Sequence, residues 1–390
     1  MKKTALFAIS AISVAFVAMA ATSFEVKEVE AHQRWPWNGM VDIDFNIECV
    51  DQAASFFVNL ECTDHDGNTN IVMKTLKYNG QGNVAKTFTL SPGRHRIVWN
   101  GDADVPNRRL RNISFAVYAK EVGAEDSASY MVIDLSGGAN ASSYPVMYLT
   151  GVPSGGWTDE YKSTKLVLRK CPAGKDPLNR YTLSKDFFVG VFEVTQKQWA
   201  LVMGSNPSSY YGVGNTYPVY YVSYDMIRGS SAGSLWPSSS AVDSDSFIGR
   251  LRTRTGISEL DLPTEAQWEY ACRAGTTTTY NTGDSESALA AAGWYSSNSS
   301  YTTHPVGEKS ANAWGLYDMH GNVWEWCLDW NNGDELSGTD PVGASSGSSR
   351  DSRGGFWDIV ADFCTSSYRY YNSPSRPHYY LGFRLSRTMP

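Results

Sequence analysis

The sequence is poor in the charged, histidine and cysteine residues on which nucleic-acid-binding and metal-binding proteins depend. Of 390 residues, only 19% are charged, six are histidine and six are cysteine, and no Cys-x-x-C pair occurs. The absence of that pair excludes a zinc ribbon and a thioredoxin-type redox motif. With a net charge of -7 and no long run of Lys or Arg, the chain is not expected to bind nucleic acid. No segment after the N-terminus has 18 consecutive apolar residues, so no transmembrane helix is expected.

The first 20 residues have the parts of a secretory signal peptide. Lys2 and Lys3 form a basic start, a mostly apolar run covers residues 5–18, and Ala18-Met19-Ala20 matches an A-x-A cleavage site. The apolar run is shorter than the ~20 residues that cross a bilayer. We therefore expect an exported protein, either secreted, periplasmic or on the cell surface. A retained membrane anchor is the alternative.

Residues 22–133 show the period-2 alternation of apolar side chains that is typical of β-strands. The alternation covers residues 41–49 and 56–62, and further strand-like runs lie at 96–99 and 113–118. We expect an antiparallel β-sandwich of immunoglobulin-like type. Cys49 and Cys62 lie on the apolar faces of successive strands. The sequence allows two alternatives for this pair, a disulfide or two buried thiols. The small polar residues 134–143 predict a linker.

Residues 144–390 are rich in Trp, Tyr, Gly, Asn and Ser and carry few long periodic segments. Two short helices are expected, at 195–203 and at 264–274. Thr195 with Gln198, and Thr264 with Gln267, have the spacing of capping boxes, and Gly275 is the expected stop. Long loops in a compact domain are functional, or are held by metals and cross-links.

The motifs of this region carry a resemblance to a known family. They are Glu193–Trp199, Met203–Pro207, LPTEAQWEYACRAGT from Leu262, Asn312–Trp326, Arg353-Gly354-Gly355 and Leu381-Gly382-Phe383-Arg384. In this order they resemble the formylglycine-generating enzyme family, also called the sulfatase-modifying factor domain. The resemblance covers nearly all of residues 144–390 and none of the first domain. It implies an α+β fold related to C-type lectins, with little regular secondary structure, preceded here by the β-sandwich.

The resemblance also implies an activity, from which this sequence departs. Active members use oxygen and copper to convert a cysteine in Cys-x-Pro-x-Arg to formylglycine, and two cysteines shortly after Gly-Gly-Ser bind the copper. Here Phe356 follows Gly354-Gly355, and Cys364 is the only cysteine from 354 to 390. Because Cu(I) needs both soft thiolates, copper is not expected. Cys364 is catalytic only under the alternative of an active enzyme.

The family comparison leads us to expect Cys272 and Cys364 to be neighbours in a disulfide that joins the second helix to the closing loop. Two buried thiols, and a redox-active or copper-binding Cys364, are the alternatives. Cys171 and Cys327 have no partner that the sequence assigns.

The resemblance implies calcium as the metal. Family members bind calcium at the segment that matches 318–325, where Asp318 and Glu325 offer side-chain oxygens and Gly321 and Val323 offer backbone carbonyls, the donors that calcium prefers. A turn in which both carboxylates accept backbone N–H groups is the alternative. Iron, which some relatives bind through a helical partner domain, is not expected, since the histidines here have no ligand spacing.

The C-terminal segment is dense in aromatic residues. Trp357 and His378, with Arg369, Arg376 and Asn372, suit a groove for a carbohydrate or an extended peptide; Tyr368, Tyr370, Tyr371, Tyr379 and Tyr380 complete the set. Loop packing is the alternative. We therefore expect an exported binding or accessory protein whose partner is an exported protein, a peptide or a glycan. The alternatives are an active sulfatase-modifying oxidoreductase and a purely structural surface protein.

Overall fold

The structure, a computed structural model, describes residues 24–34, 39–49, 56–67, 69–78, 81–82, 87–106, 113–121 and 124–389. Its contacts divide the chain into two units, residues 1–127 and residues 128–390. The signal peptide expected at residues 1–20 lies outside the described residues. Within the described ranges, no helix is long and apolar enough to cross a membrane.

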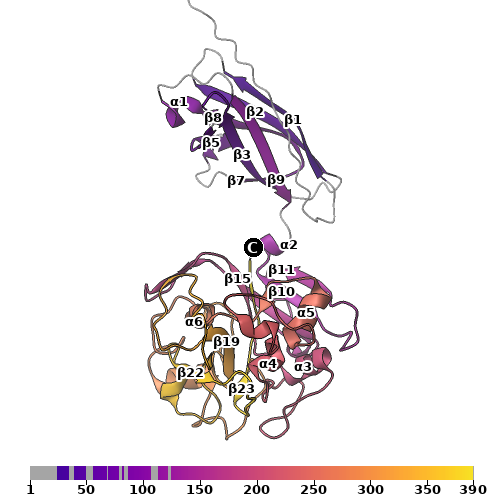
Figure 1. Ribbon diagram of the computed structural model, residues 1–390, viewed down its shortest axis with the longest axis vertical. Coiled ribbons are helices and arrows are strands. Elements are labelled where there is room, and N and C mark those ends of the chain that lie inside the picture. Colours follow the sequence, from indigo (N-terminus) through magenta and orange to yellow (C-terminus); the bar gives the residue numbers. More distant parts are fainter. Residues whose placement is uncertain are drawn as a thin grey trace, which may run out of the picture. The chain divides into compact units, whose positions relative to one another are not determined.

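Unit 1 contains two antiparallel sheets (Figure 1). One has the order β1 (Phe24–Gln33), β2 (Met40–Cys49), β8 (Gly93–Asn100), β5 (Leu76–Tyr78), β6 (Gln81–Gly82). In the other, β3 (Phe56–Asp64) pairs with β4 (Thr69–Ile71), β7 (Thr87–Leu90) and β9 (Ile113–Glu121). The four strands expected from alternation are therefore present as β2, β3, β8 and β9. Both sheets contribute to one apolar core, in which Trp99 and Phe115 meet edge to face at 5.8 Å. The immunoglobulin-like assignment stays a prediction.

The boundary between the units falls between Ser127 and Ala128, so the linker expected at residues 134–143 is wrong. Strand β10 (Tyr130–Asp134) pairs on one side with β11 (Val146–Leu149) and on the other with β12 (Lys165–Cys171). Residues 134–143 are thus a connection within one sheet of unit 2, anchored by Leu135, which is fully buried. The continuous apolar run at 130–133 forms a strand that is buried on both faces, but such a run does not show to which sheet the strand belongs.

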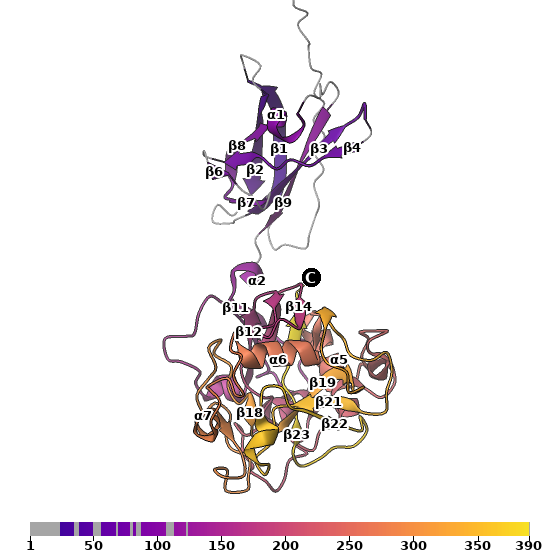
Figure 2. The ribbon, with the colours of Figure 1, turned by 90° about the vertical axis from the view of Figure 1, so that its left-hand side faces the viewer.

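Unit 2 is built on two larger sheets (Figure 2). The six-stranded sheet has the order β11, β10, β12, β15 (Phe187–Gly190), β24 (Ser386–Thr388), β16 (Leu260–Asp261). The four-stranded sheet has the order β22 (Arg369–Asn372), β21 (Arg350–Arg353), β19 (Trp324–Trp330), β23 (Leu381–Gly382). Two small sheets complete the described strands: β13 (Gly174–Lys175) with β14 (Tyr181–Leu183) and β20 (Gly338–Thr339), and β17 (Gly293–Trp294) with β18 (His320–Gly321).

The helices of unit 2 are short. They are α3 (Gln196–Met203), α4 (Tyr224–Arg228), α5 (Phe247–Thr255), α6 (Glu265–Arg273) and α7 (Glu286–Ala292), with 3-10 turns at Asp159–Lys162, Ala232–Leu235 and Ala361–Cys364. Unit 1 has α1 (Gly101–Asp104), and α2 (Ala124–Ser127) precedes the boundary. Both expected capping boxes are confirmed, at the starts of α3 and α6. Every residue of α6 is buried, as its lack of a narrow apolar stripe suggests.

The main core of unit 2 lies where α3 and α5 meet strand residues from both larger sheets. Trp199 of α3 stacks on Phe247 of α5 at 5.0 Å, and Phe383, next to β23, meets both rings edge-on. The family motifs at 193–199 and 381–384 therefore meet in this core, and the motif at 312–326 enters it through β19.

Candidate functional site

The position that matches the copper site contains a single buried sulfur atom. Gly355 has a φ of +85°, and a Cβ atom on it would lie 2.4 Å from the Sγ of Cys364, so only glycine fits there. Cys364 is 0% exposed, and burial raises the pKa of its thiol to about 12. Phe356, which stands where the family has Ser, is also buried. The local chemistry is therefore that of a protonated thiol in an apolar shell.

The expected disulfide between Cys272 and Cys364 is not formed in the structure, where both are buried thiols. They nevertheless contact the same residue, His320. The Sγ of Cys272 lies 3.8 Å from Nε2 of His320, and Nδ1 lies 2.7 Å from the carbonyl oxygen of Cys364. Burial lowers the pKa of His320 to about 4, so its imidazole is neutral. The neutral ring of His320 thus contacts the thiol of Cys272 and the backbone carbonyl of Cys364.

The other cysteines also remain thiols. Cys62 is fully buried with a thiol pKa that burial raises to about 12, and the disulfide considered for Cys49 and Cys62 is therefore not formed. Cys171 and Cys327 are 0% exposed. For Cys49 and Cys62, which lie on strands β2 and β3, the apolar pattern could not decide the pairing because an apolar strand face buries a thiol as readily as a disulfide.

The segment expected to bind calcium is buried. Asp318 accepts the N–H of Gly307 at Oδ2 (2.7 Å), while its Oδ1 is buried without a hydrogen-bond partner. Glu325 accepts from Arg384 at both carboxylate oxygens, each at 2.6 Å, and from the indole N–H of Trp268 at 2.7 Å. The alternative, a turn in which both carboxylates accept backbone N–H groups, therefore holds only for Oδ2 of Asp318. It does not hold for Glu325, which accepts from side chains.

A third carboxylate, Glu193, joins these two. It accepts the N–H of Val323 at 3.1 Å and the side-chain amide of Asn322 at 2.6 Å. Burial, together with the neighbouring Asp318 and Glu325, raises the pKa of Glu193 well above its usual value. Sequence analysis took Glu193 only as part of a motif. Its role depends on a contact across about 130 residues, which the sequence does not reveal.

The guanidinium of Arg384 lies among these three buried carboxylates and forms its carboxylate hydrogen bonds with Glu325. Burial raises the pKa of Asp318 to about 6. The orphaned Oδ1 of Asp318 fits a cation, whereas both carboxylate oxygens of Glu325 already accept hydrogen bonds. Within the described residues, no three His, Cys, Asp or Glu side chains are arranged to hold a metal ion. The calcium site expected at Asp318, Gly321, Val323 and Glu325 therefore stays a prediction.

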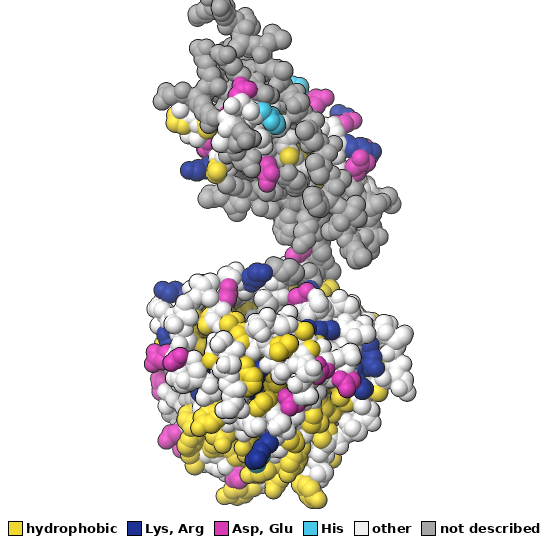
Figure 3. Space-filling view, in the orientation of Figure 1, with side chains coloured by type: hydrophobic (Ala, Val, Ile, Leu, Met, Phe, Trp, Pro, Cys, Tyr) yellow, Lys and Arg dark blue, Asp and Glu magenta, His cyan; other side chains and the backbone are white. Residues whose placement is uncertain are grey.

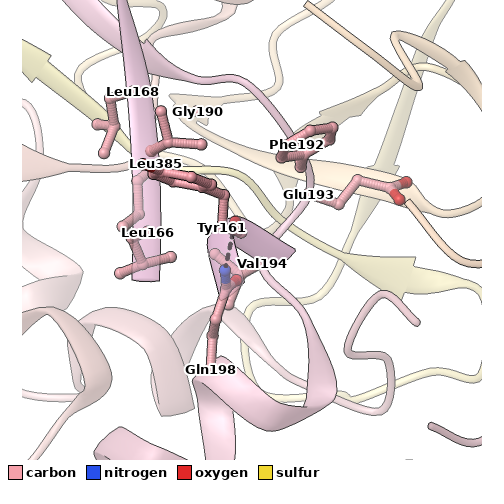
Figure 4. A pocket seen from close by; sticks show the side chains of 10 residues that line it. Tyr161, Leu166, Leu168, Gly190, Phe192, Glu193, Val194, Gln198 and Leu385 are labelled. Carbon is pink, nitrogen blue, oxygen red and sulfur yellow. Dashed lines mark hydrogen bonds between the residues drawn. The ribbon is translucent and has the colours of Figure 1, made fainter. Parts of the chain in front are cut away.

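Glu193 also lines a small cavity, which is shown in Figure 4. Its volume of about 10 Å³ accommodates at most one water molecule. Leu166 and Leu168 line it, and the Glu193 carboxylate extends away from them in Figure 4. It is too small for a substrate.

The aromatic residues expected to line a groove form a connected set of rings. Trp357 is 2% exposed and stacks on Tyr211 at 4.8 Å, and Tyr379 contacts both rings. His378 stacks on Tyr380 at 3.8 Å. The structure thus brings Trp357 and His378 to the same aromatic cluster, with Trp357 beneath it.

The two arginines of the expected groove differ in exposure and in hydrogen-bond partners. Arg369 forms an ion pair with both carboxylate oxygens of Glu265 on α6, which binds β22 to that helix. Arg376 is exposed in the turn between β22 and β23. Arg369 is only 22% exposed and paired with Glu265, whereas Arg376 is the exposed one of the two. In Figure 3, hydrophobic and tyrosine side chains gather over the part of unit 2 where β22 and β23 lie in Figure 1.

Sequence analysis missed Tyr211, which comes from the loop of residues 205–217 and not from the C-terminal segment. A tyrosine in a Ser- and Gly-rich loop has no periodic pattern, so no signal in the sequence identified it.

The comparisons with known proteins agree with this architecture. The model of the family described as sulfatase-modifying factor enzyme 1-like domain matches residues 152–389. This is more than half of the chain, and the chain belongs to that family. Chaperone protein LppX of Paenibacillus barcinonensis is 33% identical over 209 residues, which cover 43% of this chain and 72% of the relative.

Two further similarities are narrower. The formylglycine-generating enzyme of Mycobacterium tuberculosis is 50% identical over 76 residues, covering 17% of this chain and 25% of that enzyme. The solved structure of Treponema denticola variable protein 1 is 28% identical with a TM-score of 0.49, covering 60% of this chain and 98% of that one. The chain thus matches only a quarter of the length of this formylglycine-generating enzyme.

Proposed function

We propose that this protein is an exported binding or accessory member of the sulfatase-modifying factor family that does not carry out copper-dependent cysteine oxidation. The observation that carries the proposal is the single, fully buried Cys364 at the position of the family's copper pair. Two thiolates are needed to hold Cu(I), and this position has one cysteine. The raised pKa of the Cys364 thiol also disfavours its conversion to a thiolate. A relative named as a chaperone protein is compatible with a non-catalytic role.

The surface proposed for ligand binding is the exposed side of the aromatic cluster, with His378, Tyr379, Tyr380 and Arg376. Aromatic rings offer a flat apolar face at low entropic cost, and the exposed guanidinium of Arg376 adds one directional donor group. Trp357 supports this surface from below and does not contact solvent. An exported protein, a peptide or a glycan is the partner class.

The proposal is tested with a peptide that contains Cys-x-Pro-x-Arg. The purified protein is incubated with this peptide, copper and oxygen, and the peptide mass is followed. We expect no conversion of the thiol to an aldehyde and no stoichiometric Cu(I) in the protein. Conversion that disappears in Cys364→Ser would overturn the proposal and establish the alternative, an active oxidoreductase.

A structural calcium ion at Asp318 and Glu325 is proposed as well, supported by the orphaned Oδ1 of Asp318. Its role would be to neutralise buried carboxylates and hold the turn before β19. We expect calcium to raise the melting temperature of the chelator-treated protein, and Asp318→Asn to abolish most of that increase. An equal increase in the variant would assign the calcium effect to another site.

A further inference from the structure

Two buried aspartates lie next to each other in the four-stranded sheet. Asp329 belongs to β19 and Asp351 to β21, and both are 0% exposed. In this antiparallel pair of strands, Trp330 is opposite Arg350. Asp329 directly precedes Trp330, and Asp351 directly follows Arg350. Antiparallel geometry therefore places the two aspartates side by side across the strands, where the register shifts between Trp326 and Trp330.

The two carboxyl groups differ in their hydrogen bonds. Asp351 accepts the side-chain amide of Asn331 at 2.6 Å, and it lies 3.4 Å from the guanidinium of Arg369. Asp329 accepts the N–H of Glu265 at 2.7 Å with Oδ2. Its Oδ1 is buried and has no hydrogen-bond partner among the described residues. A negative charge on Asp329 would be costly, because nothing replaces the water that this oxygen loses on burial.

The neighbouring cations do not neutralise Asp329, since each of them is bound elsewhere. Arg369 donates to both carboxylate oxygens of Glu265. Arg350 donates to two backbone carbonyl groups, at 2.7 and 2.9 Å, and its guanidinium lies over the ring of Trp330 at 3.3 Å. The other charged or titratable groups that act on the pair are Glu265, Arg353 and the thiol of Cys327.

A proton suits this pair better than a metal ion does. Calcium takes about six to eight oxygen ligands, whereas Oδ1 of Asp329 is the one carboxylate oxygen of the pair without a hydrogen bond or ion pair among the described residues. A proton on Asp329 removes its charge and leaves Asp351 as the single anion. Burial, with Glu265 and Asp351 nearby, raises the pKa of Asp329 well above its usual value. The pKa of Asp351 is about 6, so the two carboxyl groups lose their protons in separate steps.

The pair lies next to a strand that contributes to the aromatic cluster. Asp351 is opposite Tyr371 of β22. Tyr370, on the same strand, contacts Tyr380 of the proposed binding surface at 6.3 Å. If Asp329 lost its proton, two buried negative charges would repel each other between β19 and β21. This repulsion would separate the strands at the point where β22 is attached.

We propose that Asp329 and Asp351 hold one proton between them at neutral pH, and that loss of this proton at higher pH loosens β22 and the aromatic surface beside it. The folded protein then keeps a proton that the unfolded chain has already released, so stability falls as pH rises. Only the consequence for ligand binding rests on the proposed function. The proton and the movement of β22 do not.

Infrared spectroscopy of the full chain tests for the proton, because a protonated carboxyl group and a carboxylate absorb at different frequencies. At pH 7, we expect Asp329→Asn to lose the absorption of one protonated carboxyl group, while its amide oxygen still accepts the N–H of Glu265. Asp245→Asn removes an exposed carboxylate of unit 2 and is the matched control, in which the protonated band stays unchanged. Asp351→Asn removes the opposing charge, so the Asp329 band should disappear at a pH lower by about one unit or more.

Hydrogen exchange measures the effect on β22. Exchange at residues 369–372, corrected for the intrinsic effect of pH, is expected to accelerate in the wild type as the Asp329 band disappears. It should not accelerate over that pH range in Asp329→Asn, and equal acceleration in both proteins would refute the loosening of β22.

Two results would overturn the proton itself. One is an unchanged protonated band in Asp329→Asn or, if that variant does not fold, an unshifted band in Asp351→Asn. The other is one equivalent of a bound metal ion that Asp329→Asn loses and Asp245→Asn keeps, which would establish a cation site instead. These measurements use neither a ligand nor the peptide-oxidation assay, so this proposal and the proposed function fail separately.

Discussion

Arg384 binds Glu325 through two hydrogen bonds of 2.6 Å, from Nε and from Nη2, and the two side chains are 0% and 1% exposed. Arg384 belongs to the closing motif, and Glu325 lies on β19, 59 residues earlier in the chain. The same guanidinium donates to the carbonyl of Gly190 on β15 at 2.9 Å. One side chain therefore joins a strand of the six-stranded sheet to a strand of the four-stranded sheet.

Replacing Arg384 with Met is expected to destabilise unit 2 by about 3–5 kcal/mol, because it leaves Glu325 as an uncompensated buried charge. Urea unfolding followed by tryptophan fluorescence measures the change. Glu160→Gln is the control, since Glu160 is 48% exposed and its ion pair with Lys165 lies at the surface, where such a pair is worth at most about 1 kcal/mol. Equal effects of both substitutions would contradict the assigned role.

A pH dependence is expected from Asp351, whose side chain is 0% exposed. Burial, with Glu265 nearby, raises its pKa to about 6. The folded state therefore binds more protons than the unfolded state between about pH 4 and 6, and the free energy of unfolding falls as pH rises through that window. Asp351→Asn is expected to flatten this decline and to stabilise the protein at pH 7 by on the order of 2 kcal/mol.

The matched comparison for Asp351 is Asp284→Asn. Hydrogen bonds from Thr279 lower the pKa of Asp284, so its contribution has the opposite sign: it is present above the unfolded-state pKa and is lost as pH falls. Asp284→Asn is expected to lower stability at neutral pH slightly. Unfolding curves between about pH 2 and 7 distinguish the two, since the Asp351 contribution changes above about pH 4 and the Asp284 contribution below it. A steeper decline in Asp351→Asn would refute the assignment.

The thiols are expected to be unreactive in the native protein. Burial raises the pKa values of Cys62, Cys272 and Cys364 to about 12, and the thiolate is the reactive form. Ellman's reagent should therefore label these cysteines only after unfolding in guanidinium. Protein that remains unlabelled after unfolding without reductant would instead indicate disulfides, as the sequence analysis expected.

The capping box of α6 predicts a measurable loss on Thr264→Ala. The Thr264 hydroxyl accepts the N–H of Gln267 at 3.1 Å, and its own N–H donates to Oε1 of Gln267 at 3.0 Å. Removing the side-chain acceptor is expected to cost about 1 kcal/mol. Thr264→Ser keeps the hydroxyl and should restore most of the stability. A thermal melt that leaves Thr264→Ala unchanged would argue against the cap.

What could be predicted from the sequence was local. The alternation over residues 41–49 predicted β2, and Thr195 with Gln198 predicted the start of α3, because each signal lies within one element. The long motifs likewise identified the family because each is a contiguous stretch of the chain.

What could not be predicted depends on distant contacts. The pairing of β10 with β12 joins residues about 35 positions apart, so the run at 130–133 was assigned to the first domain although it belongs to unit 2. Arg369 looked like part of a ligand groove until its contact with Glu265, 104 residues away, showed that it is an internal ion pair.

The pairing of β10 has a practical consequence for dissecting the chain. β10 lies between β11 and β12 and begins three residues after Ser127. A truncated protein that starts at Tyr144 would lack the strand between these two, leaving a gap in the six-stranded sheet and uncovering Leu166 and Leu168. Removal of unit 1 must therefore cut at or before Ala128 if the remainder is to stay intact.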